Sequence, residues 1–169
     1  MKKLIAAALV LAGIVISTAP AAEAAGSRVR LGVGANYWVA LENIDDVDFD
    51  DNGLSGLITF QFLPVSWLKI EVDAEYLPKG FLGSTEQVWQ PQAYLLLGDF
   101  IYGGAGVGMY YTDGEFADDP FFALKAGVDI PLGPIHLDVN ANYRFEGQLQ
   151  GSDIDTDTIF LGAAVRFGF

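Results

Sequence analysis

Apolar residues alternate with polar or small ones over long stretches of this chain, and this alternation restricts the fold more than any other feature. Between positions 135 and 146 the odd positions, from Ile135 to Phe145, are apolar, whereas the even positions include Asp138 and Arg144. Successive side chains of a β-strand point to opposite faces of the sheet, so a period of two indicates strands with two unlike faces.

The same pattern recurs along the chain without a helical segment between any two occurrences. It predicts eight strands, at 29–41, 54–62, 67–76, 88–97, 100–111, 121–130, 135–146 and 158–169. The links between them alternate strictly between short and long, with short ones at 63–66, 98–99 and 131–134 and long ones at 42–53, 78–87, 113–120 and 147–157. Tight turns at one end of a sheet and long loops at the other are typical of outer-membrane barrels. The predicted fold is therefore all-β, an eight-stranded antiparallel up-and-down transmembrane β-barrel.

The first residues predict export from the cytoplasm. Lys2 and Lys3 precede an apolar run at 4–16, and small residues at 22–24 suit a signal peptidase, so we expect a secretory signal peptide at 1–24 and a barrel domain at 25–169. The domain has no further apolar run near the roughly 20 residues that a membrane helix needs. It carries 7 basic and 21 acidic residues and no cysteine, which argues against a nucleic-acid partner, disulfides and thiol chemistry.

Periodicity alone does not say which face of the barrel meets lipid. A soluble periplasmic barrel of the lipocalin kind would turn the apolar face inward and its charges to water. The second face, however, carries Trp38, Tyr94, Tyr102 and Phe160 among its charges, which suits a crowded lumen better than a soluble exterior. Aromatic residues also gather near strand ends, as interfacial girdles do. We therefore expect the membrane arrangement, with the soluble binding barrel as an alternative.

Three stretches carry a resemblance to a known family. The segments "VRLGVGANYW" from Val29, "YGGAGVGMYY" from Tyr102 and "AAVRFGF" at the end resemble the small outer-membrane barrels of the outer membrane protein A and X type, without a peptidoglycan-binding domain. The resemblance implies location in the cell outer membrane and a terminal strand that the outer-membrane assembly machinery recognises. The residues of that signal would be Leu161, Val165, Phe167 and Phe169.

Nearly all basic residues of the barrel domain fall on the inward parity. Six bases and six acids share it, the bases being Arg28, Arg30, Lys69, Lys125, Arg144 and Arg166 and the acids Glu71, Asp73, Glu75, Asp129, Asp138 and Glu146. The lumen of an eight-stranded barrel is only wide enough to be filled by side chains. We therefore predict an ion-pair network that plugs the interior, with a narrow water-filled channel as the alternative.

The remaining acids define the extracellular loops, which carry fourteen acidic residues against the single Lys79. Such a rim could share the divalent cations that hold lipopolysaccharide together. The stretch from Asp48 to Gly53 imitates the start of a calcium loop, but the position of the essential glutamate is Thr59, inside a predicted strand. We therefore expect a solvated loop, and no metal or cofactor.

Catalysis is not predicted. His136, the single histidine, lies just after a short turn, far from the outer rim where barrel enzymes of this kind generally hold their sites, and Asp138 is its nearest acid in the sequence. The glycines from Gly103 to Gly108 lack the following helix of a dinucleotide site and are better explained as room for large lumen side chains. The sequence thus predicts a monomeric barrel with a structural or surface-interaction role at the outer-membrane lipid and lipopolysaccharide, with a small cation-preferring channel as the second possibility.

Overall fold

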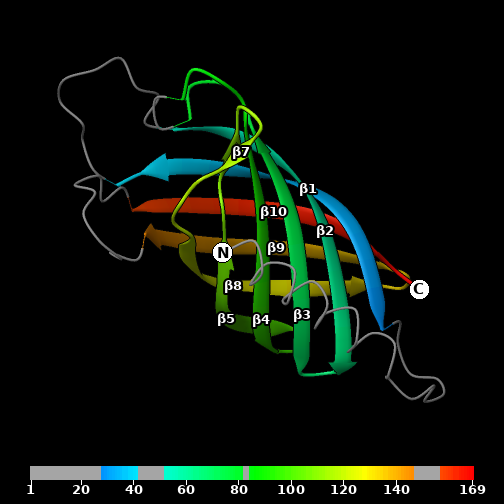
Figure 1. Ribbon diagram of the computed structural model, residues 1–169. Coiled ribbons are helices and arrows are strands. Elements are labelled where there is room, and N and C mark those ends of the chain that lie inside the picture. Colours follow the sequence, from blue (N-terminus) through cyan, green and yellow to red (C-terminus); the bar gives the residue numbers. More distant parts are fainter. Residues whose placement is uncertain (1–27, 42–51, 82–83, 147–156) are drawn as a thin grey trace.

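The computed structural model describes residues 28–41, 52–81, 84–146 and 157–169. Within these ranges the chain forms one antiparallel sheet that closes on itself (Figure 1). The barrel strands are β1 (Val29–Ala40), β2 (Asn52–Val65), β3 (Leu68–Leu77), β4 (Val88–Gly98), β5 (Ile101–Gly108), β8 (Phe121–Leu132), β9 (Ile135–Glu146) and β10 (Thr158–Gly168). Each pairs with its neighbour in the sequence, and β1 pairs with β10 to close the ring. This confirms the predicted eight-stranded up-and-down barrel.

Short turns join the strands at one end of the barrel. Between β8 and β9 the link is only Gly133 and Pro134, and Gly133 has a φ of 71°, which side-chain-bearing residues rarely adopt. Gly98, with a φ of 119°, ends β4 just before the next turn. The described ends of the chain meet here too, because the Phe169 amide donates a 2.9 Å hydrogen bond to the carbonyl of Val29.

The other end of the barrel departs from the predicted strand limits. The strand expected at 100–111 ends at Gly108, and a small hairpin of β6 (Tyr111–Thr112) and β7 (Glu115–Phe116) follows it. Pro91, on β4, explains the break. Its carbonyl accepts a 3.1 Å hydrogen bond from the amide of Met109. Pro91 has no N–H to donate in return on this side, and the hydrogen-bonded pairing of β4 with β5 stops here, at Gln92 and Gly108.

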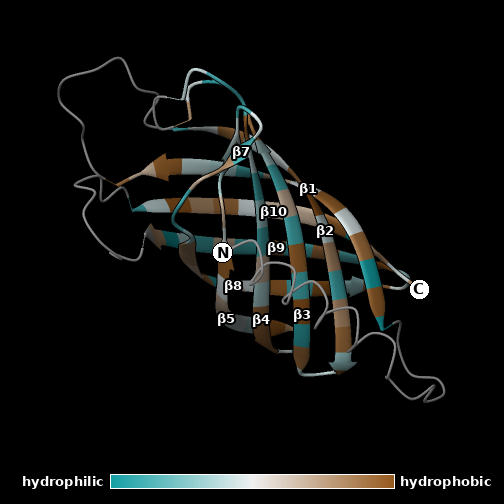
Figure 2. Ribbon diagram, viewed as in Figure 1, coloured by the Kyte–Doolittle hydropathy of each residue, from teal (hydrophilic) through white to brown (hydrophobic). Residues whose placement is uncertain are grey.

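The two faces of the sheet differ as the alternation predicts (Figure 2). Leu31, Val33 and Ile58 are about half exposed on the outside, whereas Lys69, Glu71 and Arg166 are fully buried inside. A soluble lipocalin-like barrel would have the opposite arrangement, so this alternative is wrong. The part of the chain that the structure describes contains no helix that is long and apolar enough to cross a membrane.

Candidate functional site

The barrel interior is the candidate functional site, because the inward parity of the strands brings nearly every charged strand residue into it. Five bases and five acids are buried there, namely Arg30, Lys69, Lys125, Arg144 and Arg166 with Glu71, Asp73, Glu75, Asp129 and Asp138. Arg28, predicted inside, is only half buried at the barrel end, and the side chain of Glu146 lies outside the description. The buried set is therefore formally neutral, with five charges of each sign.

Near the short turns, one carboxylate holds three basic side chains. Asp129 pairs with Arg30, with the ammonium of Lys69 at 2.9 Å and with Nδ1 of His136 at 2.9 Å. Lys69 also donates a 2.8 Å hydrogen bond to the carbonyl of Asp99 and lies 4.5 Å from the ring centroid of Tyr102. The acid paired with His136 is therefore Asp129, from the neighbouring strand β8, and not its sequence neighbour Asp138.

In the middle of the barrel, Glu71 of β3 reaches across the lumen to two bases, which come from β8 and β10. It pairs with Lys125 of β8 and lies 2.9 Å from the guanidinium of Arg166 of β10. Gln61 donates a further hydrogen bond to it, at 2.5 Å. Both carboxylate oxygens of Glu71 therefore accept hydrogen bonds, which is the condition under which a buried carboxylate is tolerated.

The two bases of this central level each hold a second acid. Lys125 lies 3.0 Å from Asp73, and Arg166 lies 2.8 Å from Asp138. Asp138 also accepts a 2.6 Å hydrogen bond from the hydroxyl of Tyr102 on β5. The central level thus connects strands from all around the barrel through side chains alone.

Toward the long loops, Glu75 and Arg144 form a separate buried pair with 2.5 Å between their charged atoms. Glu75 also accepts hydrogen bonds from Asn36 at 2.6 Å, from Gln92 at 2.9 Å and from Ser55. The Arg144 guanidinium lies 3.4 Å from the ring centroid of Phe160, so a cation–π contact joins the pair to an apolar cluster of the interior.

Above this pair the interior becomes apolar. The residues of this apolar lid are Trp38, Leu77, Phe81, Val88 and Phe160, all at most 4% exposed. Phe81 comes from the loop after β3, and its ring meets that of Trp38 edge-on at 4.8 Å between centroids. The lid was not predicted. Trp38 and Phe160 were placed on the inward parity, but a loop residue such as Phe81 has no periodicity that would reveal its position.

The glycines of β5 provide room for large lumen side chains, as expected. A Cβ on Gly106 would lie 2.3 Å from the ring of Tyr94, and one on Gly108 would lie 2.3 Å from the ring of Phe121. These glycines therefore allow two inward aromatic rings to lie against the wall of the barrel.

The terminal strand presents the residues of the expected assembly signal to the outside. Leu161 and Phe167 are about half exposed, Val165 is 38% exposed and Phe169 is 75% exposed. Arg166, between them, points inward. The segment thus combines a lipid-facing apolar row with one member of the interior network.

The expected calcium-like loop begins at Asp48, which lies outside the described residues. Within the described ranges, no group of three His, Asp or Glu side chains is arranged to hold a metal ion. Thr59, which occupies the place of the missing calcium ligand, is fully buried in the lumen and lies 3.3 Å from Nε of Arg166.

Comparisons with known proteins agree with this architecture. Residues 6–167 match the family described as the outer membrane protein beta-barrel domain. The crystal structure of Neisserial surface protein A aligns with a TM-score of 0.64 and 18% identity, covering 86% of this chain and 100% of that one. The N-terminal barrel domain of Pseudomonas aeruginosa OprF aligns with a TM-score of 0.50 and 10% identity, over 85% and 100%.

No curated protein sequence matches the chain closely. The structural likenesses show the fold, and the family match extends over nearly the whole sequence. The protein is therefore a β-barrel of the cell outer membrane and belongs to the outer membrane protein beta-barrel family.

Proposed function

We propose that this protein is an outer-membrane barrel with a plugged lumen, which acts as a structural or surface-interaction protein through its acidic extracellular loops. The observation that carries the proposal is the filling of the interior by five buried bases and five buried acids. An ion moving along the axis would have to separate pairs such as Glu71 and Arg166. Removing one partner of such a pair costs about 3–5 kcal/mol, which makes passage unfavourable.

The apolar lid adds a second barrier on the loop side. The rings of Trp38, Phe81 and Phe160 pack against one another there, and hydrophobic constrictions of this kind hinder conduction by excluding water. The polar network and the lid act at different levels, so opening one would still leave the other.

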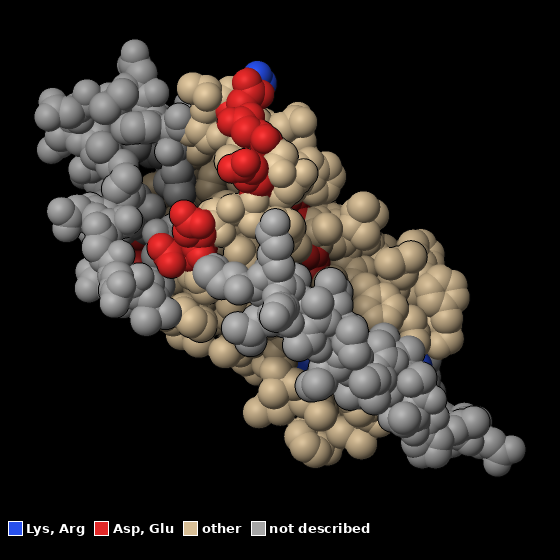
Figure 3. Space-filling model, viewed as in Figure 1, with Lys and Arg blue, Asp and Glu red and all other residues tan. Residues whose placement is uncertain are grey.

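The surface role rests on the charge of the loops. Glu86, Asp113, Glu115, Asp118 and Asp119 lie in the described part of the outer rim, and acids gather on that side of the molecule in Figure 3. Lipopolysaccharide with its divalent cations is the proposed neighbour of this rim, and the assembly machinery is the proposed partner of the terminal strand. Since each protomer closes its own sheet, we propose a monomer.

An enzymatic role is not part of the proposal. The imidazole of His136 is 12% exposed and is occupied by Asp129 near the short turns. Barrel chemistry on outer-leaflet lipids would require a reactive group near the long loops, at the other end of the strands.

Planar-bilayer recording tests the plugged lumen. The wild-type protein should show no steady conductance, and neither should Phe81→Ala, which opens the lid but leaves the ion pairs beneath it in place. Steady, ion-selective current through the wild-type protein would contradict the proposal.

A small cation-preferring channel is the second candidate, and one observation favours it. Near Arg144, three buried atoms have no hydrogen-bond partner among the residues that the structure describes, namely its own Nε, Nε2 of Gln90 and Oδ1 of Asn142. Buried polar atoms normally bind water when no protein partner is available, so these atoms favour water at this level of the lumen, as a channel requires. The same recording separates the two candidates.

A further inference from the structure

Four aromatic residues form a continuous row on the outside of the barrel at the loop end. Tyr76 of β3 is directly opposite Trp89 of β4, Trp89 is opposite Tyr111 of β6, and Tyr111 is opposite Phe116 of β7. The rings of Tyr76 and Trp89 meet edge-on at 5.2 Å, and those of Tyr111 and Phe116 lie 4.9 Å apart. Tyr76 and Trp89 belong to the barrel wall, and the hairpin of β6 and β7 continues the aromatic row with Tyr111 and Phe116.

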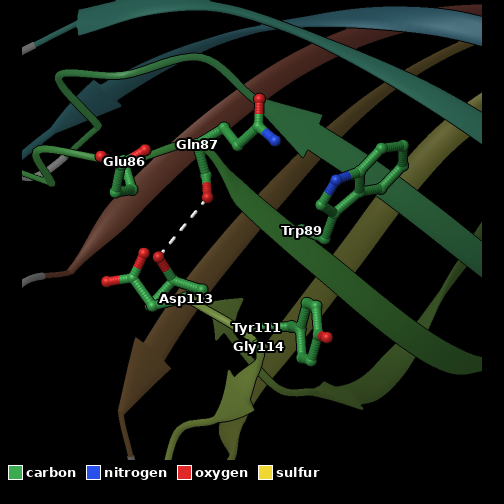
Figure 4. A pocket seen from close by; sticks show the side chains of 7 residues that line it. Glu86, Gln87, Trp89, Tyr111, Asp113 and Gly114 are labelled. Carbon is green, nitrogen blue, oxygen red and sulfur yellow. Dashed lines mark hydrogen bonds between the residues drawn. The ribbon is translucent and has the colours of Figure 1, made fainter.

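A hollow of about 240 Å³ lies beside this row, between the start of β4 and the β6–β7 turn. Trp89 and Tyr111 line it together with Glu86, Gln87, Thr112 and Asp113. Figure 4 shows the two carboxylates toward one side and the two rings toward the other. We call this hollow the rim groove.

Side-chain hydrogen bonds and a tight turn fix the two walls of the rim groove relative to each other. The hydroxyl of Thr112 donates a 3.5 Å hydrogen bond to the carbonyl of Gln87, across the groove. The hydroxyl of Tyr76 lies 3.3 Å from Oε1 of the Gln87 side chain. Asp113 and Gly114 make the turn with φ angles of 53° and 85°, in the left-handed region. The groove is therefore formed by paired strands and a tight turn rather than by a loose loop.

The charge of the rim groove selects the kind of ligand. Glu86 and Asp113 line it, and Glu115, Asp118 and Asp119 follow in the adjoining segment. An anion such as a phosphate would be repelled. A cation is attracted instead, as the ammonium of Lys79 shows by lying 3.1 Å from Oε2 of Glu86.

Aromatic faces next to carboxylates are the usual surroundings of organic ammonium groups. The rings attract a cation through their quadrupoles, and the carboxylates attract it through their charge. An uncharged molecule of the same shape would gain only the contact area. A cation with methyl or methylene groups therefore fits the rim groove better than either a neutral ligand or a bare metal ion.

We propose that the rim groove binds an organic ammonium group, with Trp89 and Tyr111 as the aromatic contacts and Glu86 and Asp113 as the counter-charges. The inference rests on the proposed surface role, for which it names a ligand class, but it does not require a plugged lumen. The ammonium group could belong to a lipid headgroup in the outer leaflet or to a free amine outside the cell.

Choline is the probe for a titration of the full barrel, folded in a non-ionic maltoside detergent. The protein contains three tryptophans, so their indole N–H signals can be assigned by substitution and followed by NMR. Choline should shift the Trp89 signal in a saturable way, whereas 3,3-dimethylbutanol, its uncharged counterpart, should not. Equal shifts with both compounds, or no saturable shift with choline, would overturn the proposal.

Variants assign the binding to the rim groove. Glu86→Gln and Asp113→Asn should each weaken choline binding, followed at the Trp89 indole. Trp89→Leu, followed by calorimetry, should weaken it by about two- to fivefold or more, the range expected for one exposed cation–π contact. Lys79→Met should strengthen it by releasing Glu86. Trp67→Leu, which removes another exposed tryptophan at the opposite end of the barrel, is the matched control and should change nothing. Unchanged binding in the Glu86 and Asp113 variants would refute the assignment.

Lipid nanodiscs distinguish the two sources of the ammonium group. If a headgroup is the natural ligand, choline should bind more weakly in discs containing phosphatidylethanolamine than in discs of phosphatidylglycerol. Equal affinity in both indicates a free amine. Conductance is recorded in planar bilayers with the same protein preparation. A barrel that binds choline and also conducts would contradict the plugged lumen alone, and one that neither conducts nor binds choline would contradict this inference alone.

Discussion

Replacing Arg144 by methionine tests the energetic meaning of the interior network most directly. The substitution keeps much of the side-chain volume but leaves the Glu75 carboxylate buried without its counter-charge. Breaking one partner of a buried pair costs about 3–5 kcal/mol. Glu75 would still accept hydrogen bonds from Asn36, Ser55 and Gln92, so we expect the lower end, about 3 kcal/mol of unfolding free energy.

Two further variants make the result interpretable. Lys79→Met breaks the exposed pair with Glu86, whose side chains are 65% and 46% exposed, and should cost at most about 1 kcal/mol. Glu75→Gln combined with Arg144→Met removes both charges and should be more stable than Arg144→Met alone, because no uncompensated charge remains.

The assay is equilibrium unfolding in urea of barrels inserted into lipid vesicles, with the folded fraction followed by gel mobility. A loss below about 1 kcal/mol for Arg144→Met, with no recovery in the double variant, would refute the reasoning, since it would mean that water already reaches the pair.

Two other outcomes follow from the terminal strand and from β5. Phe169→Ala should lower the outer-membrane fraction in cell fractionation and leave protein in the periplasm, whereas Phe100→Ala, which removes another exposed aromatic ring at the same barrel end, should insert normally; normal insertion of both would argue against the assembly signal. Gly106→Ala should destabilise the barrel by about 1–3 kcal/mol in the same urea assay, because its Cβ would meet the ring of Tyr94 at 2.3 Å. Gly56→Ala, where nothing lies within 4 Å, is the matched control, and an equal effect of the two would contradict the steric explanation.

The strands were predictable from the sequence because alternation is a local property of the chain. Adjacent residues such as Arg30 and Leu31 point to opposite faces of the sheet, so their order in the sequence already decides which side chain enters the lumen. The limits of the strands were less predictable. β5 stops at Gly108 because of Pro91 on the neighbouring strand, and a contact between strands leaves no trace in the periodicity of either one.

The partners within the network could not be predicted for a related reason. Lys69 of β3 meets Asp129 of β8, on a strand that is not adjacent to β3 in the sheet. Such a contact depends on the tilt of the strands and on how far each side chain reaches across the lumen. Sequence parity shows that both residues point inward, but it contains no information about their relative height along the barrel axis.

The pairing of β1 with β10 has a consequence for the folding kinetics of the chain. Arg30 is directly opposite Gly168, so the contact that closes the ring joins residues from opposite ends of the sequence. Such non-local pairings are slow to form, because the entropy of closing a long loop is lost before the contact is gained. Until β10 arrives, β1 and β9 each expose an unpaired edge that can join another chain. Membrane insertion must therefore outpace aggregation during the whole interval between synthesis of β1 and docking of β10.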